Sequence, residues 1–333
     1  MTTGNIKNHP DLAIAAYAGR PVLVTGGAGF IGSHLATRLV ALGAHVTVID
    51  DLSEGRADNL RHIRDQIRFV HASILDADAL ADAVEGKDLV FHEAALASVP
   101  RSVAEPERTN EVNVIGTLRV LQACVNHDVP RLVYASSSSV YGDLPTLPKH
   151  ESHVPQPLSP YAQQKLSGEH MCSVWSACYG LTTVSLRYFN VFGPRQAADS
   201  AYAAVVAAFA TALLAGEQPR IYGDGSASRD FTYIDNVVNA NLAAGSCDPT
   251  LSGRVFNIAM GQRITVLELL QEMATLTGRP ADVDFLPPRE GDVEHSLADI
   301  EAARNELGFQ PTVALREGLH HTLQWYESQR NGT

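Results

Sequence analysis

Lysine, cysteine and long apolar stretches are all scarce in this chain of 333 residues, and each scarcity excludes a class of protein. The net charge is −12 and the basic residues are scattered, which argues against binding of nucleic acid. The few cysteines show no C-x-x-C spacing, so we expect reduced core thiols and no metal site. The longest apolar stretch, 201–215, is shorter than the about 20 residues that a membrane span needs, and it predicts a buried or interface helix.

The beginning of the chain lacks the pattern of a basic segment followed by an apolar one that marks a secretory signal. We therefore expect a soluble, cytoplasmic protein that does not contact membranes. The length allows one large domain or two modest ones with ample core.

Strand-like and helix-like segments alternate from residue 21 onward. The expected strands are 21–25, 45–50, 67–71, 88–92, 131–136 and 182–187, and the expected helices are 30–42, 76–85, 109–127 and 160–179. This alternation predicts an α/β protein with a Rossmann-type doubly wound parallel sheet.

The regularity weakens after residue 194, which predicts a smaller C-terminal α/β substrate domain. We assign residues 1–20 to an N-terminal extension and 21–194 to the sheet domain, with a return to it at about 230–260. The substrate domain then comprises 195–229 and 261–333, with further helices and a short strand near 282–285.

The segment PVLVTGGAGFIG at 21–32 carries a glycine turn between an expected strand and an expected helix. Gly26, Gly29 and Gly32 fit a G-x-x-G-x-x-G cradle, in which glycines permit a tight turn, close approach of a pyrophosphate and packing of helix on strand. The amides of the following helix would point at the same pyrophosphate. This context predicts a dinucleotide site.

Asp50 ends the next expected strand, about twenty residues after the glycines, where a carboxylate can accept hydrogen bonds from ribose hydroxyls. It would repel a 2′-phosphate, and no arginine follows until Arg56, so NAD is favoured over NADP. The alternative is that Asp50 and Asp51 merely open a turn.

Tyr161 and Lys165 are four residues apart in SPYAQQK, behind a predicted N-cap at Ser159 and a proline at the first helical position. The pair therefore shares one helix face. A phenol with a pKa of about 10 is a weak base at neutral pH, but a nearby ammonium and a cationic nicotinamide favour the phenolate. An ordinary exposed pair on a helix is the alternative.

Four serines, Ser136 to Ser139, follow an expected strand, so they are predicted at the edge of the sheet where ligands bind. Their hydroxyls can serve both a sugar and its reacting oxygen. A polar loop without function is the alternative.

Together these motifs resemble the extended short-chain dehydrogenase/reductase superfamily, and within it the nucleotide-sugar 4-epimerases. The resemblance covers residues 20–327 and rests on GGAGFIG, Asp50, HEAA at 92–95, NVIGT at 113–117, the serine run with VYG, Y-x-x-x-K, RYFNVFGPRQ at 187–196, SRDFTYIDN at 228–236 and REGDVEHS at 289–296.

The resemblance implies a role for each matching residue. Tyr161 would be the base, Lys165 its activator, and Ser137 the hydroxyl that bonds the reacting sugar oxygen. The cofactor NAD would be contacted by Gly26, Gly29, Phe30, Ile31, Gly32, Asp50, Asp51, Ser53, Gly55, Ser73, Ile74, Ala94, Ala95, Tyr161, Lys165 and Tyr188. The UDP-sugar would be contacted by Ala97, Ser138, Ser139, Asn190, Gln196, Ala204, Val205, Tyr222, Arg229, Arg289, Asp292 and Ser296. Among these, Arg229 and Arg289 would hold the diphosphate, and Tyr222 and Val205 the uridine.

The implied reaction is a redox-neutral 4-epimerisation through a 4-keto sugar. Dehydratases of the superfamily have Asp-Glu where this chain has Ser138 and Ser139, which cannot act as carboxylate bases. Small residues at Ser296, Ala97 and Ala204 favour UDP-GlcNAc and UDP-GalNAc, with UDP-glucose and UDP-galactose as further substrates.

The alternatives are a UDP-glucuronate 4-epimerase, a nucleotide-sugar 4,6-dehydratase and a non-catalytic NAD-binding regulator. Ser73 stands where the family usually has an acidic residue for the adenine amine, so this contact is expected to be weaker. The helices at 109–127 and 160–179 form the usual dimer face of the superfamily, so the resemblance also implies a homodimer.

Overall fold

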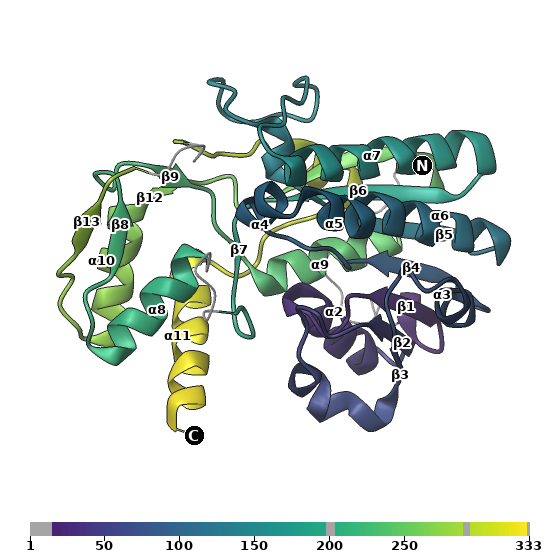
Figure 1. Ribbon diagram of the computed structural model, residues 1–333, viewed down its shortest axis with the longest axis horizontal. Coiled ribbons are helices and arrows are strands. Elements are labelled where there is room, and N and C mark those ends of the chain that lie inside the picture. The colour runs from purple at the N-terminus through teal and green to yellow at the C-terminus, as the bar shows by residue number, and fades with distance from the viewer. Residues whose placement is uncertain (1–14, 198–203, 289–293, 332–333) are drawn as a thin grey trace, which may run out of the picture.

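A seven-stranded parallel sheet forms the centre of the molecule (Figure 1). The computed structural model describes residues 15–197, 204–288 and 294–331. The strand order is β11-β6-β5-β4-β1-β2-β3. Their bounds are β1 (Pro21–Thr25), β2 (His45–Asp50), β3 (Ile67–His71), β4 (Leu89–His92), β5 (Arg131–Ser137), β6 (Thr182–Tyr188) and β11 (Arg254–Ile258). The chain winds outward from β1 in both directions, which confirms the predicted doubly wound topology.

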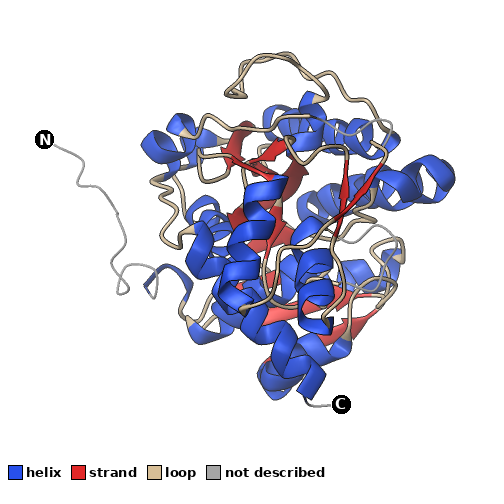
Figure 2. Ribbon diagram, turned by 90° about the vertical axis from the view of Figure 1, so that its left-hand side faces the viewer, coloured by secondary structure: helices blue, strands red, loops and turns tan. Residues whose placement is uncertain are grey.

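Helices cover both faces of this sheet, as the side view shows (Figure 2). On one face α2 (Phe30–Ala41) packs on α9 (Ile234–Gly245), and on the other lie α3 (Ala77–Val84), α6 (Thr117–Asn126) and α7 (Pro160–Tyr179). A strand covered on both faces needs apolar side chains in both directions, which explains the continuous run Val22–Val24 in β1.

The second half of the chain adds a smaller layer beside the sheet (Figure 1). There α8 (Val205–Ala215) packs against α10 (Val266–Thr277) and α11 (Leu315–Asn331). Short strand pairs link this layer: β7 (Val191–Phe192) with β10 (Thr232–Tyr233), β8 (Arg220–Tyr222) with β13 (Asp284–Leu286), and β9 (Ser228–Arg229) with β12 (Ile264–Thr265). The buried helix expected at 201–215 is confirmed for its described part, where Val206, Phe209 and Leu213 are buried.

The predicted helix at 109–127 proves to be three segments. These are α5 (Pro106–Asn110), a π-helical turn η2 (Glu111–Gly116) and α6. A further short helix, α4 (Val99–Ala104), and the segments η1 (Ala57–Gln66), η3 (Ser138–Tyr141) and η4 (Pro249–Leu251) were not expected from the sequence, whereas η5 (Ala303–Leu307) lies where further helices were expected. Such short segments carry too few apolar positions for periodicity to reveal them.

All four cysteines are free thiols, as expected. Cys124 and Cys172 are buried, but Cys178 is exposed near the end of α7, so the expectation of core thiols is wrong for that residue. Within the described residues, no helix is long and apolar enough to cross a membrane, and no cluster of three or more potential ligands could hold a metal ion.

Candidate active site

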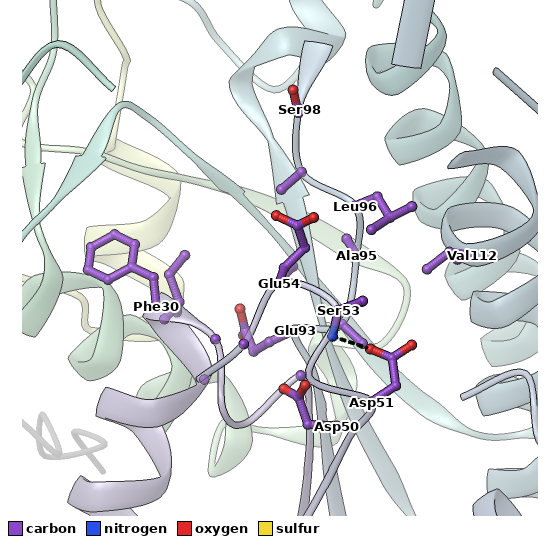
Figure 3. A pocket seen from close by; sticks show the side chains of 18 of the residues that line it. Phe30, Asp50, Asp51, Ser53, Glu54, Glu93, Ala95, Leu96, Ser98 and Val112 are labelled. Atoms are coloured by element: carbon purple, nitrogen blue, oxygen red, sulfur yellow. Dashed lines mark hydrogen bonds between the residues drawn. The ribbon is translucent and has the colours of Figure 1, made fainter. Parts of the chain in front are cut away.

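A cavity of about 400 Å³ opens at the carboxyl ends of β1, β2, β4 and β5 (Figure 3). This is the edge at which ligands bind in doubly wound sheets. Each residue predicted to contact the cofactor lines it: Gly26, Gly29, Phe30, Ile31, Gly32, Asp50, Asp51, Ser53, Gly55, Ser73, Ile74, Ala94, Ala95, Tyr161, Lys165 and Tyr188.

The glycine turn at the floor of this cavity leaves no room for side chains. Gly26 has a φ of +66°, and a Cβ atom there would lie 2.7 Å from the backbone of Ala94. A Cβ atom on Gly32 would lie 2.2 Å from the carbonyl oxygen of Gly26. At the N-terminus of α2, Gly29 supplies no side-chain cap, so the first amides of the helix are available to an anionic ligand.

Asp50 is buried at the end of β2, and two backbone amides fix its carboxylate. Oδ2 accepts from Ala28 N at 2.9 Å and Oδ1 accepts from Leu52 N at 2.8 Å. Burial raises the pKa of Asp50, and these amides partly offset that effect. Each oxygen keeps a second lone pair for a ribose hydroxyl. Asp51 instead binds the amide of Ser53 at 2.9 Å (Figure 3).

Lys165 reaches the cavity from α7, whose predicted N-cap is confirmed because Ser159 accepts from Ala162 N at 3.2 Å. The ammonium of Lys165 donates to the carbonyl oxygen of Ala135 at 2.7 Å and lies 6.0 Å from the ring centroid of Tyr161. Burial lowers the pKa of Lys165 to about 8. The ammonium is therefore held beside the phenol and is still charged at neutral pH.

Without a bound cofactor, the side chain of Tyr161 is a neutral phenol at neutral pH. Burial raises its pKa to about 12, a hydrogen bond with Ser137 lowers it, and the charge of Glu93 raises it further. A base at neutral pH needs another positive charge in the cavity. The oxidised nicotinamide ring of NAD supplies such a charge, so the electrostatics of the residues present fit this cofactor.

The serine run lies where the sequence predicted it, at the end of β5. Ser137 caps η3 and its Oγ accepts from Ser139 N at 3.2 Å and from Ser139 Oγ at 2.9 Å. Of the run, Ser136 lines the cavity, and it also bonds the carboxylate of Glu169. In the described part of the chain, Ser137, Ser138 and Ser139 do not line this cavity or the one beside it.

A second cavity of about 1150 Å³ lies in the smaller layer, among β7, α8, β8, β9 and β13. Of the predicted substrate residues it is lined by Asn190, Ala204, Val205, Tyr222 and Arg229. Ala204 also lines the first cavity, together with Ala97 and Gln196, so the two adjoin there. Arg229 donates to the carbonyl oxygens of Ser228 at 3.0 Å and Glu294 at 2.9 Å.

Besides Ser138 and Ser139, three more predicted substrate residues are not found in the described lining of either cavity. Ser296 lines neither cavity among the described residues, but its amide donates to Ser228 O at 2.9 Å, beside Arg229. Arg289 and Asp292 lie outside the described residues. Their predicted roles, like those of the other site residues, stay predictions.

The sequence reading missed several residues that line the first cavity. Glu93 belongs to the HEAA motif but received no role, although it is the residue directly after β4. Glu54 and Arg101 form an ion pair across 47 positions of sequence, and both line the cavity. A pairing at that separation leaves no local pattern, whereas the position of Glu93 after a strand is a signal that could have been used.

Comparison with known proteins agrees with this geometry. Residues 22–259 match the model of the NAD dependent epimerase/dehydratase family. The chain is 42% identical over 311 residues to UDP-glucose 4-epimerase of Mycolicibacterium smegmatis, an alignment that covers 92% of this chain and 98% of that protein.

Solved structures of UDP-sugar 4-epimerases are also similar to this chain. UDP-N-acetylglucosamine 4-epimerase from Methanobrevibacter ruminantium M1, in complex with UDP-N-acetylmuramic acid, has a TM-score of 0.90 and 42% identity over 94% of this chain and 99% of its own. UDP-glucose 4-epimerase of Thermus thermophilus, in complex with NAD, has a TM-score of 0.84 and 36% identity over 92% of this chain and 98% of its own. This chain therefore belongs to the NAD dependent epimerase/dehydratase family and is an enzyme whose cofactor is NAD.

Proposed function

We propose that this enzyme is a UDP-sugar 4-epimerase that interconverts UDP-GlcNAc and UDP-GalNAc, with UDP-glucose and UDP-galactose as further substrates. The observation that carries the proposal is the position of Tyr161 and Lys165 in the first cavity, which adjoins the second at Ala204. A cofactor held in the first cavity and a sugar nucleotide held in the second would meet at this pair. The activities named for the M. smegmatis and M. ruminantium proteins support the same reading.

The two cavities correspond to two proposed domains. The proposed sheet domain, 21–194 with the return at about 230–260, supplies most of the first cavity through its part 21–194, and the proposed substrate domain, 195–229 and 261–333, supplies most of the second. In the second cavity Tyr222 and Val205 offer apolar surface for a uracil ring, and Arg229 offers charge for a diphosphate.

The chemistry begins with the proton on the sugar O4′. NAD would be held by the glycine turn and Asp50, and it would supply an acceptor for the C4′ hydride. Tyr161 removes the O4′ proton, and Lys165 stabilises its phenolate from one helical turn away. In this proposal Ser137, whose hydrogen bond lowers the pKa of Tyr161, would bond the same sugar oxygen. The 4-keto sugar then turns over about its link to the diphosphate, and Tyr161 gives the proton back to the inverted oxygen.

Dehydration and decarboxylation have less support. They need a carboxylate base next to the sugar, and Ser138 and Ser139 occupy the positions that would carry it. The relatives include a dTDP-glucose 4,6-dehydratase of Streptomyces niveus at 34% identity, so this distinction depends on the serines and not on overall similarity.

The choice of sugar is proposed from the small residues at the junction. Ala97 and Ala204 line the first cavity and leave room for an acetamido group. The test is to incubate the protein separately with UDP-GlcNAc, UDP-glucose and UDP-glucuronate and follow the anomeric signals by NMR. We expect UDP-GalNAc to form fastest. Turnover of UDP-glucuronate alone would contradict the sugar choice, and a 4-keto-6-deoxy product would contradict the reaction.

We also propose that the enzyme is a homodimer that pairs through the face formed by residues 109–127 and 160–179. Large apolar side chains are exposed there and on a short helix packed against it: Val174 on α7, Ile115 on η2 and Val103 on α4. Exposed apolar side chains gathered in one region are typical of an interface. A single monomeric mass at micromolar concentration in sedimentation would contradict this proposal.

A further inference from the structure

Glu93 is a carboxylate in the cofactor cavity that the proposed mechanism does not use. It follows β4 directly, and its side chain lines the cavity, as that of Asp50 does (Figure 3). A carboxyl group in such a place loses water contacts, so it persists only where its partners compensate. Its surroundings therefore indicate what it does.

A chain of hydrogen bonds orients this carboxyl group. Tyr188, the last residue of β6, donates from its hydroxyl to Glu93 Oε1 at 2.9 Å. Asn241 of α9 in turn donates from Nδ2 to the Tyr188 hydroxyl oxygen at 2.8 Å. The carboxyl group is thus oriented by two elements that lie far from it in the sequence.

The charges that face Glu93 come mainly from α7. Tyr161 and Lys165 line the same cavity as Glu93. Consistent with this, the charge of Lys165 lowers the pKa of Glu93, and the charge of Glu93 raises the pKa of Tyr161. The neighbours on other elements are neutral: Tyr188 is a buried phenol on β6, and burial lowers the pKa of His92 on β4 to about 3. Asn241 of α9 does not titrate. Glu169 of α7 also acts on Lys165, but its carboxylate forms an ion pair with Arg187 at 2.7 Å. Among the described residues, Glu93 is therefore a carboxylate beside the catalytic pair that is not neutralised by an ion pair.

We propose that Glu93 is a positioning residue of the active site, which holds the Tyr188 hydroxyl at the cofactor cavity and supplies the negative charge that sets the pH range in which Tyr161 and Lys165 act. This inference rests on the proposed 4-epimerase function and deepens it. Glu93 does not exchange a proton with the sugar in this scheme. It acts through the two residues that do the chemistry.

The direction of the effect follows from the charges. A carboxylate stabilises the ammonium of Lys165 and destabilises the phenolate of Tyr161, so it raises both pKa values. Replacing it by a neutral amide lowers both. The rising limb of the pH–rate profile, which reports formation of the phenolate, and the falling limb, which reports loss of the ammonium, then both move to lower pH. Burial raises the pKa of Glu93 itself to about 7. The two limbs of the pH–rate profile therefore report the coupled titration of Glu93, Tyr161 and Lys165 and not of single residues.

The test compares pH–rate profiles of the NAD-loaded wild type, Glu93→Gln and the matched control Glu85→Gln, an exposed residue at the end of α3. We expect both limbs of Glu93→Gln to move down by about one pH unit, the size of shift that a nearby charge produces. The control should keep the wild-type limbs. Lower activity with both limbs unmoved would make Glu93 a structural residue only and would overturn the proposal.

A second variant and a second readout keep the test independent of folding and of turnover. Tyr188→Phe retains the carboxylate but removes the hydroxyl that lowers its pKa, so Glu93 is charged less often and the limbs move in the same direction by a smaller amount. The tyrosinate absorbance of Tyr161, obtained by subtracting a Tyr161→Phe partner in each background, should likewise develop at lower pH in Glu93→Gln. If the wild type turns over no sugar nucleotide, the proposed function fails. The tyrosinate absorbance then remains as the test of whether Glu93 affects the pKa of Tyr161. An unmoved absorbance would overturn the inference.

Discussion

Lys165 donates a hydrogen bond to the carbonyl oxygen of Ala135 at 2.7 Å, and this contact ties the middle of α7 to the end of β5. The helix and the strand each carry one part of the site, Tyr161 on α7 and the serine run on β5. The lysine thus joins the two elements, and in the proposed mechanism its charge stabilises the phenolate of Tyr161. Burying an ammonium group away from water destabilises the folded protein, and such destabilisation is expected at a functional site.

Replacing Lys165 by methionine should therefore stabilise the protein while removing its activity. The folded-state pKa of about 8 lies below the ordinary value of 10.5, so burial of the charge costs about 3 kcal/mol. That cost is fully present below pH 8. It falls as the pH rises from 8 to 10.5, because the folded protein releases the proton while the unfolded chain keeps it. The free energy of unfolding in urea, measured at several pH values, checks both statements.

The pH series is also the internal control for this variant. The stability advantage of Lys165→Met should be largest at neutral pH and should shrink above pH 8. A variant less stable than the wild type at pH 7, or an advantage that does not change with pH, would contradict the assignment of a buried charge.

Tyr161→Phe should lose at least about 100-fold in kcat, in line with removal of a general base. It should still retain NAD, because the glycine turn and Asp50 are untouched. The matched control is Tyr179→Phe on the same helix, whose side chain is 54% exposed. Steady-state kinetics and the cofactor content after gel filtration measure the two properties. Near-wild-type turnover by Tyr161→Phe would refute its role as base.

Asp50→Asn should weaken NAD binding by at least about tenfold, since a hydrogen bond to a charged group contributes about 1.5–3 kcal/mol. The amide also cannot accept from Ala28 N and Leu52 N with both terminal atoms, so the turn after β2 loses one contact. Asp58→Asn, an exposed carboxylate in η1, is the control. Calorimetric titration with NAD distinguishes them, and equal affinities would show that Asp50 only opens a turn.

Gly32→Ala should abolish NAD binding and reduce stability, because the added Cβ atom would lie 2.2 Å from the carbonyl oxygen of Gly26. Gly180→Ala is a control for backbone strain alone, since Gly180 has a φ of +72° with open space around it. We expect the control to cost about 1 kcal/mol and to bind NAD normally. A Gly32→Ala protein that retains NAD would mean that α2 can move away from the turn without loss of the cradle.

The central sheet could be predicted closely from the sequence. The expected strands at 21–25, 45–50 and 67–71 have the bounds of β1, β2 and β3. β1 and β2 are buried parallel strands, which are short apolar runs between polar turns, whereas the edge strand β3 is partly buried at Ile67, Phe69 and Val70. The helix at 160–179 also matches α7, since Ser159, Pro160 and Gly180 mark its ends. In these segments local pattern and tertiary packing require the same residues.

Other parts depended on contacts that no local pattern contains. The strands of the smaller layer are two or three residues long, and pairings such as β8 with β13 join distant segments. The ion pair of Arg101 with Glu54 and the bond from Tyr188 to Glu93 likewise form only once the sheet is assembled. The glycine turn and the Tyr161–Lys165 pair were visible because their geometry is local.

The central claim is that hydrogen leaves C4′ as hydride and returns to the same carbon without exchange with solvent. Epimerisation of UDP-GlcNAc by the NAD-loaded enzyme in deuterium oxide tests this claim most directly, with deuterium at C4′ of the product measured by NMR and mass spectrometry. We expect the UDP-GalNAc that forms to carry no deuterium at C4′. Product with deuterium at that carbon would show that a proton and not a hydride is moved, and it would contradict the mechanism.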